Sequence, residues 1–426
     1  MVMMKILYLF FCINLVCYAQ EISFSVNHAQ YHKKSQLVLM MIGKETAELQ
    51  QIAQLIKKAL EFKGQCEVTM QSSSSFIKRK EAGAYKQKGY DYIIFLESHP
   101  NDYHWHLFDT EQQETIQSKK VAKRLVLRAT AYALADSLQE TLTGEPSFFS
   151  TKIAYTQEKP LKNGKHYSYI YMADYDVSNP ELLVEFPTIS VSPRWNNDPN
   201  RPLLFYSENT NANVRMMAIG MDKKRIMASN FEGINMQPTF GPGGSSVVYC
   251  ATRGSGNCQL YHWSNKQLSK LTNNPGNNFA PCYSADGKTI YFSSDFETGQ
   301  PQIYAYSMED KQLTRLTKDG YCVSPSCCVQ RNQLAYARMV NGVMQLFAYD
   351  FTKKVHMQLT FDAAQKEECS WSPCGTFLMC PVDNGKTNRI ALFNTITQEY
   401  TYVTDAKYCC ASPTWSGVYN EFPIVS

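Results

Sequence analysis

The segment Pro281 to Thr317, PCYSADGKTIYFSSDFETGQPQIYAYSMEDKQLTRLT, sets a pattern that much of the chain repeats. The related segments begin at spacings of 45, 43, 44, 44 and 44 residues, counted from the first copy. Their anchor residues are Pro193, Pro238, Pro281, Pro325, Cys369 and Pro413. A period of this length, sustained over so many copies, indicates a β-propeller in which each repeat forms one blade.

Each repeat contains the parts of a four-stranded antiparallel blade. The anchor strand is followed by a turn, which is Asp286-Gly287 in the clearest copy. Second and third strands follow, such as Ile290 to Ser293 and Gln302 to Tyr306, and the fourth ends in Leu316-Thr317. Strand-forming runs separated by Gly and Asp turns are typical of such blades. We expect the anchor strands to line the central channel.

The number of repeats predicts how the ring closes. Five full units start at the anchors from Pro193 to Cys369, but only 14 residues remain from Pro413 onward. The strands that the sixth unit lacks are found before the first anchor, at Lys152 to Tyr155, Tyr167 to Tyr175 and Leu182 to Phe186. A C-terminal strand that joins them would complete a sixth blade and hide the sheet edges. The prediction is a six-bladed propeller closed by N- and C-terminal strands that share one blade.

A small α/β domain is predicted before the propeller. Gln36 to Ile42 and Tyr92 to Leu96 are apolar runs typical of buried strands, and Lys44 to Lys63 has the apolar spacing of a helix. A long helix is expected to close this domain, with an apolar stripe from Val121 to Leu142. The predicted domains are a signal peptide over 1–19, an α/β domain over 20–148 and the propeller over 149–426.

The first residues resemble a secretory signal peptide. Lys5 precedes the apolar run Ile6 to Val16, which is too short for a comfortable membrane span. Cys17-Tyr18-Ala19 offers the small residues of a cleavage site after Ala19. A lipoprotein signal would need Leu where Asn14 stands, so simple cleavage is favoured. We therefore expect an exported chain.

Export affects the interpretation of the 14 cysteines, since disulfides persist in oxidising compartments. Cys250 and Cys258 flank a turn symmetrically, which suggests a disulfide across a hairpin. The alternative is that the cysteines are small buried hydrophobes in strands. No Cys-x-x-Cys motif occurs, so no zinc site and no cofactor is expected. His104 and His106 share one face of a strand, but a surface strand is the simpler interpretation than a metal pair.

The charge of the chain argues against nucleic acid as a partner. The formal net charge is +4 over 426 residues. Nucleic-acid binding normally requires basic residues gathered on one element. The densest basic cluster is Lys78 to Lys80, which reads as a solvated helix end.

Taken together, these features resemble the TolB family of periplasmic propeller proteins of the Tol–Pal envelope system. The resemblance rests on the signal peptide, the small α/β domain, the Pro-x-aromatic-Ser-x-Asp-Gly…Gln-Ile-Tyr…Leu-Thr units and the split closing blade. It also covers the junction Gly144 to Thr156 and the Asp174-Tyr175-Asp176 turn. The resemblance implies a monomeric, non-catalytic periplasmic protein that links the lipoprotein Pal to the inner-membrane protein TolA. It also implies roles in envelope integrity, outer-membrane constriction during division and protein import, with other outer-membrane proteins as further partners.

The resemblance also implies two binding regions. The extreme N-terminal segment would contact TolA, and an alternating segment can add a strand to a partner's sheet. Its residues are Glu21, Ile22, Ser23, Phe24, Ser25 and Val26. Pal would bind the loops that lead into the anchor strands at one mouth of the channel. These residues are Asn235, Gln237, Asn277, Asn278, Phe279, Tyr321, Glu367, Glu368 and Lys407.

Two other functions fit a propeller. A peptidase of the propeller-capped type would need a Gly-x-Ser-x-Gly elbow and a hydrolase domain, whereas Gly254-Ser255-Gly256 reads as a turn. A lyase or a glycosidase would have its site in the mouth, and a glycosidase needs two facing carboxylates. The loop acids available for that are Glu208, Asp286, Asp295, Glu368 and Asp383. A general envelope adaptor would use the same channel face.

Overall fold

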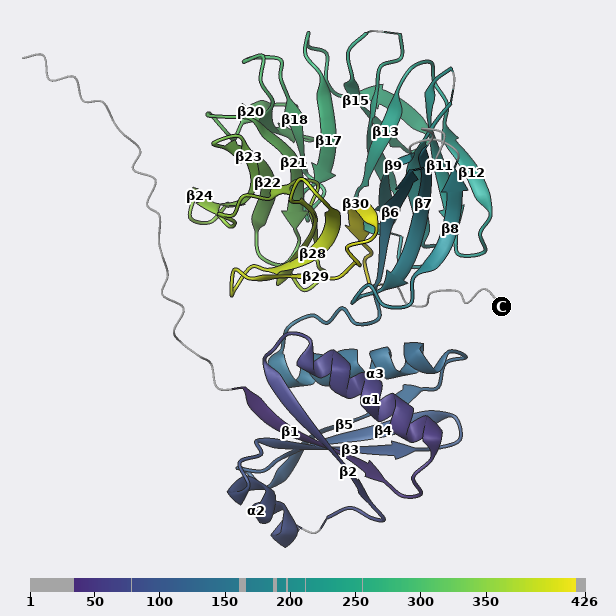
Figure 1. The fold of residues 1–426 in the computed structure, drawn as a ribbon, viewed down its shortest axis with the longest axis vertical. Helices are drawn as coiled ribbons and strands as arrows, with labels where there is room; N and C mark the ends of the chain where they lie inside the picture. The colour runs from purple at the N-terminus through teal and green to yellow at the C-terminus, as the bar shows by residue number, and fades with distance from the viewer. Residues whose placement is uncertain are drawn as a thin grey trace, which may run out of the picture.

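The computed structural model describes residues 34–77, 79–160, 166–186, 190–196, 198–210, 212–254 and 256–418. The predicted signal peptide and the segment Glu21 to Val26 lie outside these residues. The described part forms a small α/β domain and a large ring of β-sheets, stacked one above the other in Figure 1. None of the described helices has the length and apolar character needed for a membrane span.

The α/β domain is built on a five-stranded sheet with the order β2-β1-β3-β4-β5. Its strands are β1 (Ser35–Ile42), β2 (Cys66–Ser73), β3 (Tyr92–Ser98), β4 (Asp102–Asp109) and β5 (Glu114–Ala122). Helices α1 (Ala47–Glu61) and α3 (Leu127–Thr143) pack on one face of the sheet, and α2 (Arg79–Gln87) lies at the other. Strand β1 is buried on both faces because helices cover both, as its continuous apolar run predicts.

The start of the last helix differs from the prediction. Val121 belongs to β5 rather than to the helix, and the side chain of Leu125 is 94% exposed. The helix begins only at Leu127, because β5 continues along β4 as far as Ala122. The apolar spacing was therefore misleading over its first two members, where it continued from a strand into a turn.

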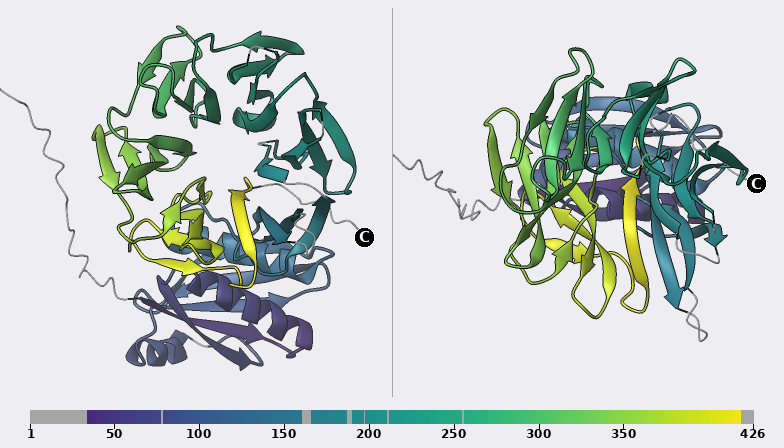
Figure 2. Two further views of the ribbon diagram at one scale, coloured as in Figure 1. Left: turned by 45° about the horizontal axis from the view of Figure 1, so that its top comes forward. Right: turned by 90° about the horizontal axis from the view of Figure 1, so that it is seen from above.

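The propeller consists, within the described residues, of six sheets arranged around a centre (Figure 2, left). The first three consecutive blades, from inner to outer strand, follow. They are β9 (Ser190–Trp195), β10 (Leu203–Asn209), β11 (Val214–Gly220) and β12 (Arg225–Ser229); then β13 (Asn235–Phe240), β14 (Ser246–Ala251), β15 (Gln259–Ser264) and β16 (Gln267–Lys270); then β17 (Asn278–Tyr283), β18 (Thr289–Ser294), β19 (Gln302–Ser307) and β20 (Leu313–Arg315).

The remaining blades follow the same order. The fourth has β21 (Cys322–Cys328), β22 (Gln333–Val340), β23 (Val343–Asp350) and β24 (Val355–Gln358). The fifth has an interrupted inner strand, β25 (Gln365–Lys366) with β26 (Ser370–Trp371), then β27 (Phe377–Asp383), β28 (Asn388–Asn394) and β29 (Tyr400–Tyr402). The closing blade has β30 (Cys409–Trp415), β6 (Lys152–Pro160), β7 (His166–Asp174) and β8 (Glu181–Phe186).

The closing blade confirms the predicted sharing of one sheet by both ends of the propeller. Strand β30 pairs antiparallel with β6, with Trp415 opposite Ile153 and Ala411 opposite Thr156. In Figure 2 the yellow β30 lies beside the teal strands of the same blade. The ring is thus closed by backbone hydrogen bonds between segments more than 250 residues apart.

The core of the ring lies between neighbouring blades. Val248, Cys250 and Leu260 of the second blade pack against Ile290 and Phe292 of the third, for example. These side chains are fully buried because each blade covers the face of the next. Burial of this kind stabilises the ring by about 25 cal/mol for each Å² of apolar surface removed from water.

The α/β domain packs against the closing and fifth blades. Phe62, just after α1, stacks edge-on against Tyr175 and Phe377, at ring centroid distances of 5.0 and 5.6 Å. Arg128 of α3 contacts Asp174 at 3.0 Å. Tyr175 lies in the β7–β8 turn and Phe377 follows the β26–β27 turn, so both are at the end of the blades opposite the loops that lead into the inner strands. The α/β domain therefore leaves that second end of the ring uncovered.

Candidate functional site

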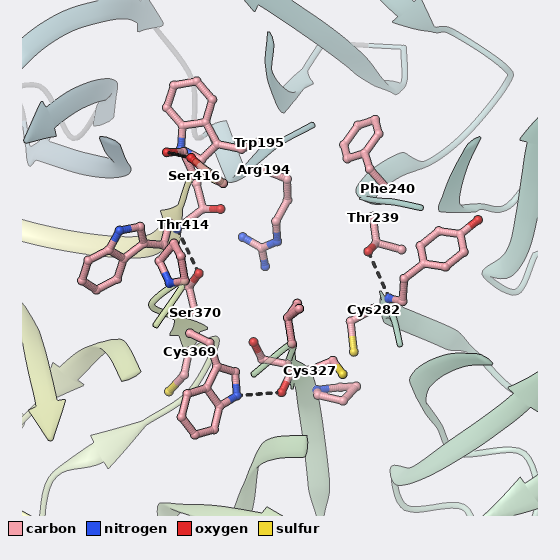
Figure 3. Close-up of a pocket in the computed structure, with 18 of the residues that line it drawn as sticks. Arg194, Trp195, Thr239, Phe240, Cys282, Cys327, Cys369, Ser370, Thr414 and Ser416 are labelled. Carbon is pink, nitrogen blue, oxygen red and sulfur yellow. Dashed lines mark hydrogen bonds between the residues drawn. The ribbon is translucent and has the colours of Figure 1, made fainter. Parts of the chain in front are cut away.

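The inner strands of the blades surround a channel with a volume of about 520 Å³. Figure 3 shows side chains from several blades that point into it. The lining comes from all six anchor segments, as the sequence predicted. A volume of this size is within the range of ligand-binding cavities.

The residue before each anchor has a left-handed backbone. These φ angles lie between 47° and 57°, although none of the residues is glycine. The six residues are Ser192, Gln237, Ala280, Ser324, Glu368 and Ser412. The strand register shifts at this point, for instance between Met236 and Thr239. Such bulges bend an inner strand and redirect its side chains, and strained residues of this kind gather at binding sites.

The residue after each anchor reaches toward the next blade. The Thr239 hydroxyl accepts a hydrogen bond of 3.3 Å from the backbone N–H of Tyr283. The Ser370 hydroxyl accepts one of 2.9 Å from the backbone N–H of Trp415. Cys282 takes the same position with the backbone of Cys327 as its partner. The first blade departs from this pattern, because Arg194 stands at this position.

Arg194 and Glu368 are the charged side chains among the described residues that line the channel. The Arg194 guanidinium donates a hydrogen bond of 2.9 Å to the carbonyl of Pro193. Glu368 accepts a hydrogen bond of 2.8 Å from the hydroxyl of Ser412. Burial lowers the pKa of Arg194, and the negative charge of Glu368 opposes that shift. Opposite charges thus face the same channel, and the two side chains are not among the described ion pairs.

The residues expected to bind Pal divide into three groups. Gln237 and Glu368 line the channel. Asn277, Glu367 and Lys407 are exposed near its mouth, Tyr321 is 36% exposed there, and Phe279 is half-buried. Asn235 and Asn278 are instead fully buried.

The two buried asparagines correct the predicted face. The Asn235 amide donates to the carbonyls of Val214 and Phe231, and the Asn278 amide donates to the carbonyl of Cys258. Each side chain satisfies backbone groups of the loop that leads into its own strand. Buried amides of this kind are structural, because unpaired backbone groups are costly. Asn235 and Asn278 are therefore not contact residues.

Exposed apolar side chains near the mouth were missed by the sequence analysis. Phe361 is 69% exposed in the loop between β24 and β25. Phe231 precedes β13, and Met339 lies at the β22–β23 turn on the same end of the blades; both are exposed. Phe231 also lies 4.0 Å beneath the guanidinium of Arg253. We call Phe231, Tyr321, Met339 and Phe361 the apolar rim.

The predicted Cys250–Cys258 disulfide is wrong for this structure, in which both thiols are free and buried. The strand register places Cys250 opposite Leu260, so Cys258 lies beyond the facing position. The described cysteines otherwise fit the alternative of small buried residues. Burial raises the pKa of Cys327 to about 12, which makes this channel thiol unreactive at neutral pH.

The carboxylates that a propeller enzyme would use are already bound to other groups. Glu208 pairs with Arg215 at 2.8 Å, and Asp295 accepts the backbone N–H of Asn277 at 2.7 Å. Asp286 holds its turn through Ser284. Among the described lining residues Glu368 is the one carboxylate, so the facing pair of a glycosidase is not assembled there.

The histidines of the α/β domain form a local cluster. His104 contacts Asp102 at 3.0 Å, and its ring stacks on His99 at a centroid distance of 3.9 Å. Ligand atoms of Glu97, His99 and His104 lie within 4.8 Å of one another. His106 points to Ser118 instead. A zinc ion needs ring nitrogens that converge on one point, whereas the stacked rings here lie side by side. The cluster fits a hydrogen-bonded hairpin turn.

Comparison with known proteins places this architecture in a family. Residues 139–419 match the family model "TolB beta propeller domain". The chain is 29% identical over 194 residues to the Tol-Pal system protein TolB of Bordetella pertussis, covering 43% of this chain and 41% of the relative. The protein of the same name from Francisella tularensis subsp. mediasiatica is 28% identical over 250 residues, with 55% and 56% covered. The aligned part thus spans about half or less of these relatives.

A solved structure extends the likeness to nearly the whole chain. The crystal structure of TolB from Acinetobacter baumannii superposes with a TM-score of 0.74. The match covers 90% of this chain and 96% of that structure at 20% identity. It includes the α/β domain as well as the ring, so the two-domain fold is shared.

Proposed function

Since this chain belongs to the TolB β-propeller family, we propose that it is a non-catalytic binding component of a Tol–Pal envelope system. In this role it would act in the periplasm after cleavage of its signal peptide. It would link a Pal-like lipoprotein at the outer membrane to a TolA-like protein of the inner membrane. Support of envelope integrity, division and protein import would follow from that link.

The observation that carries the proposal is the uncovered mouth of the ring. The α/β domain occupies the opposite end, through Phe62, Tyr175 and Phe377. The uncovered end combines a polar channel with exposed aromatic and methionine side chains. Aromatic and methionine residues are enriched at protein–protein interfaces. We therefore assign the Pal-like partner to this mouth.

The contact residues proposed at the mouth are revised by the structure. Gln237, Asn277, Phe279, Tyr321, Glu367, Glu368 and Lys407 remain from the sequence, and the rest of the apolar rim is added. Exposed apolar side chains surrounded by polar residues are the usual anchors of such surfaces.

The proposed contact with a TolA-like protein uses Glu21 to Val26. Support comes from the alternating sequence, which suits addition of a strand to a partner's sheet. We further propose that occupancy of the mouth and access to this segment are linked, so that a Pal-like and a TolA-like partner compete. A linkage of this kind is reciprocal, since each partner would change the affinity for the other by the same factor.

A capture experiment tests the proposal. The chain from Gln20 to Ser426, immobilised at physiological salt, should retain the soluble domain of a Pal-like lipoprotein from the same organism. Deletion of Glu21 to Val26 should abolish retention of a TolA-like domain and leave retention of the Pal-like domain intact or stronger. Absence of Pal-like capture by the complete chain would refute the assignment and favour a general adaptor.

A further inference from the structure

One position of the channel wall stands apart from the others. The residue after each anchor is short in five blades, where Thr239, Cys282, Ser326, Ser370 and Thr414 stand. The first blade carries Arg194 instead, and its guanidinium extends toward the middle of the channel (Figure 3). A ring of small polar side chains thus surrounds a single long cation.

The guanidinium has few partners of its own. Within the described residues its hydrogen bond is to the adjacent Pro193 carbonyl, and no ion pair includes it. An arginine side chain has five N–H donors, so most of them face the channel space. Glu368 does not neutralise the guanidinium by contact, because its carboxylate is held by Ser412. A largely enclosed cation with unused donors favours an anion that enters from solution.

The lining narrows the chemistry of that anion. Arg194 is the one cationic side chain among the described lining residues, which otherwise contribute hydroxyl, thiol and aromatic groups. A doubly charged phosphate would lack a second cation here and would also face Glu368. A carboxylate carries one charge and matches the planar guanidinium with two parallel hydrogen bonds.

We propose that the channel is a carboxylate-binding site anchored by Arg194. The carboxylate belongs either to an acidic side chain of the protein docked at the mouth or to a free small organic acid. The first source rests on the proposed function, whereas the second does not. The about 520 Å³ of the cavity accommodates either one.

Binding of the anion is tested with acetate as the probe. Titration of the chain with sodium acetate, at ionic strength held constant with sodium chloride, should raise its melting temperature to a plateau. Arg194→Met should weaken the apparent affinity about tenfold or more, as expected for loss of a charge-assisted pair. Arg194→Lys should be intermediate because it keeps the charge without the planar fork.

Two controls make this arm decisive. Arg201→Met removes the same charge from an exposed arginine and should bind acetate as the wild type does. Glu368→Gln should bind acetate as well as or better than the wild type. The proposal is overturned if the wild type shows no saturable effect, if Arg194→Met is unchanged, or if acetate binds only after Glu368→Gln. The last result would mean that Arg194 and Glu368 pair across the channel.

The second arm identifies the source of the carboxylate. If a partner's acidic side chain enters the channel, acetate should compete with capture of the Pal-like domain, and Arg194→Met should weaken that capture. If capture is insensitive to both while acetate still binds through Arg194, the ligand is a free acid. If the complete chain captures no Pal-like domain, the proposed function fails, and the acetate titration still decides on the anion site.

Discussion

The indole Nε1 of Trp415 donates a hydrogen bond of 2.7 Å to the hydroxyl of Thr151, 264 residues earlier. Both residues are buried, and Thr151 immediately precedes β6. This bond therefore fastens the last strand of the ring to the start of the propeller.

Thr151→Val should destabilise the protein by about 1–3 kcal/mol, because it leaves the buried indole N–H without an acceptor at nearly constant volume. Urea denaturation would measure the change in the free energy of unfolding. Thr401→Val, at an exposed position of β29, is the matched control and should change little. An equal effect of both substitutions would show that the bond does not hold the ring closed.

Asp174→Asn should uncouple the two domains. The buried Asp174 carboxylate contacts Arg128 at 3.0 Å, and it also contacts Lys152 and Tyr132. Removal of one partner from a buried charge network costs about 3–5 kcal/mol. Calorimetry should show a lower melting temperature, with the α/β domain melting before the ring. Asp222→Asn on the surface serves as control, and a single unshifted transition in Asp174→Asn would contradict the expectation.

Phe361→Ala should weaken capture of the Pal-like domain about tenfold, if Phe361 is an anchor of the proposed interface. Because the side chain is 69% exposed, the melting temperature should hardly change. Leu313→Ala removes an exposed apolar side chain from the outer strand β20 and should leave the affinity unaltered. Equal affinities of Phe361→Ala and the wild type would exclude the apolar rim as the docking surface.

Glu48 should make stability depend on acid pH. A hydrogen bond from Tyr103 lowers the pKa of Glu48 from its ordinary value of 4.5, and Lys123 acts in the same direction. A lowered pKa means that the folded state prefers the ionised form. Its contribution is therefore fully present above pH 4.5 and is lost as the pH falls through the folded value.

The measurement is the difference in unfolding free energy between the wild type and Glu48→Gln from pH 7 to pH 3. This difference should shrink as the solution becomes more acidic. In a Tyr103→Phe background the shrinkage should be much smaller, since the first cause of the shift is removed. A difference that does not vary with pH would contradict the assignment.

Thiol labelling without reductant tests the disulfide correction. Cys409 is exposed, whereas the pKa of its neighbour Cys410 is raised to about 12 by burial. A maleimide at neutral pH should therefore modify Cys409 first, and Cys409→Ser should abolish this phase. Cys250 and Cys258 should become labelled only after unfolding. If they stay unlabelled in denaturant until a reductant is added, the disulfide exists after all.

Much of the fold follows from the sequence because its signals repeat. The copies of Pro281 to Thr317 fix the blade length, and the short final unit at Pro413 fixes the shared blade. The left-handed residues before the anchors carry no such signal, since Gln237 and Glu368 are ordinary side chains that normally avoid this conformation. Their backbone is imposed by the bulge, a tertiary effect.

The candidate site was less accessible to prediction for a similar reason. Asn235 and Asn278 occupy the predicted loops, yet their amides turn inward to backbone groups that only the folded loop creates. Phe361 was missed because a single apolar residue in a loop does not reveal whether it is buried or exposed. Arg194 lies at a repeat position whose direction becomes clear only when the blades are placed in a ring.

The shared blade also determines the order in which this protein can be assembled. Strand β6 is synthesised early, but its inner neighbour β30 is complete only when Trp415 has been made. Until then the other blades form an open crescent with an unpaired strand edge at Ala154 and Thr156. Such edges invite association with other chains, and closing so long a loop carries an entropic cost. The last step of folding is therefore a ring closure, and the nascent chain needs protection until that step is reached.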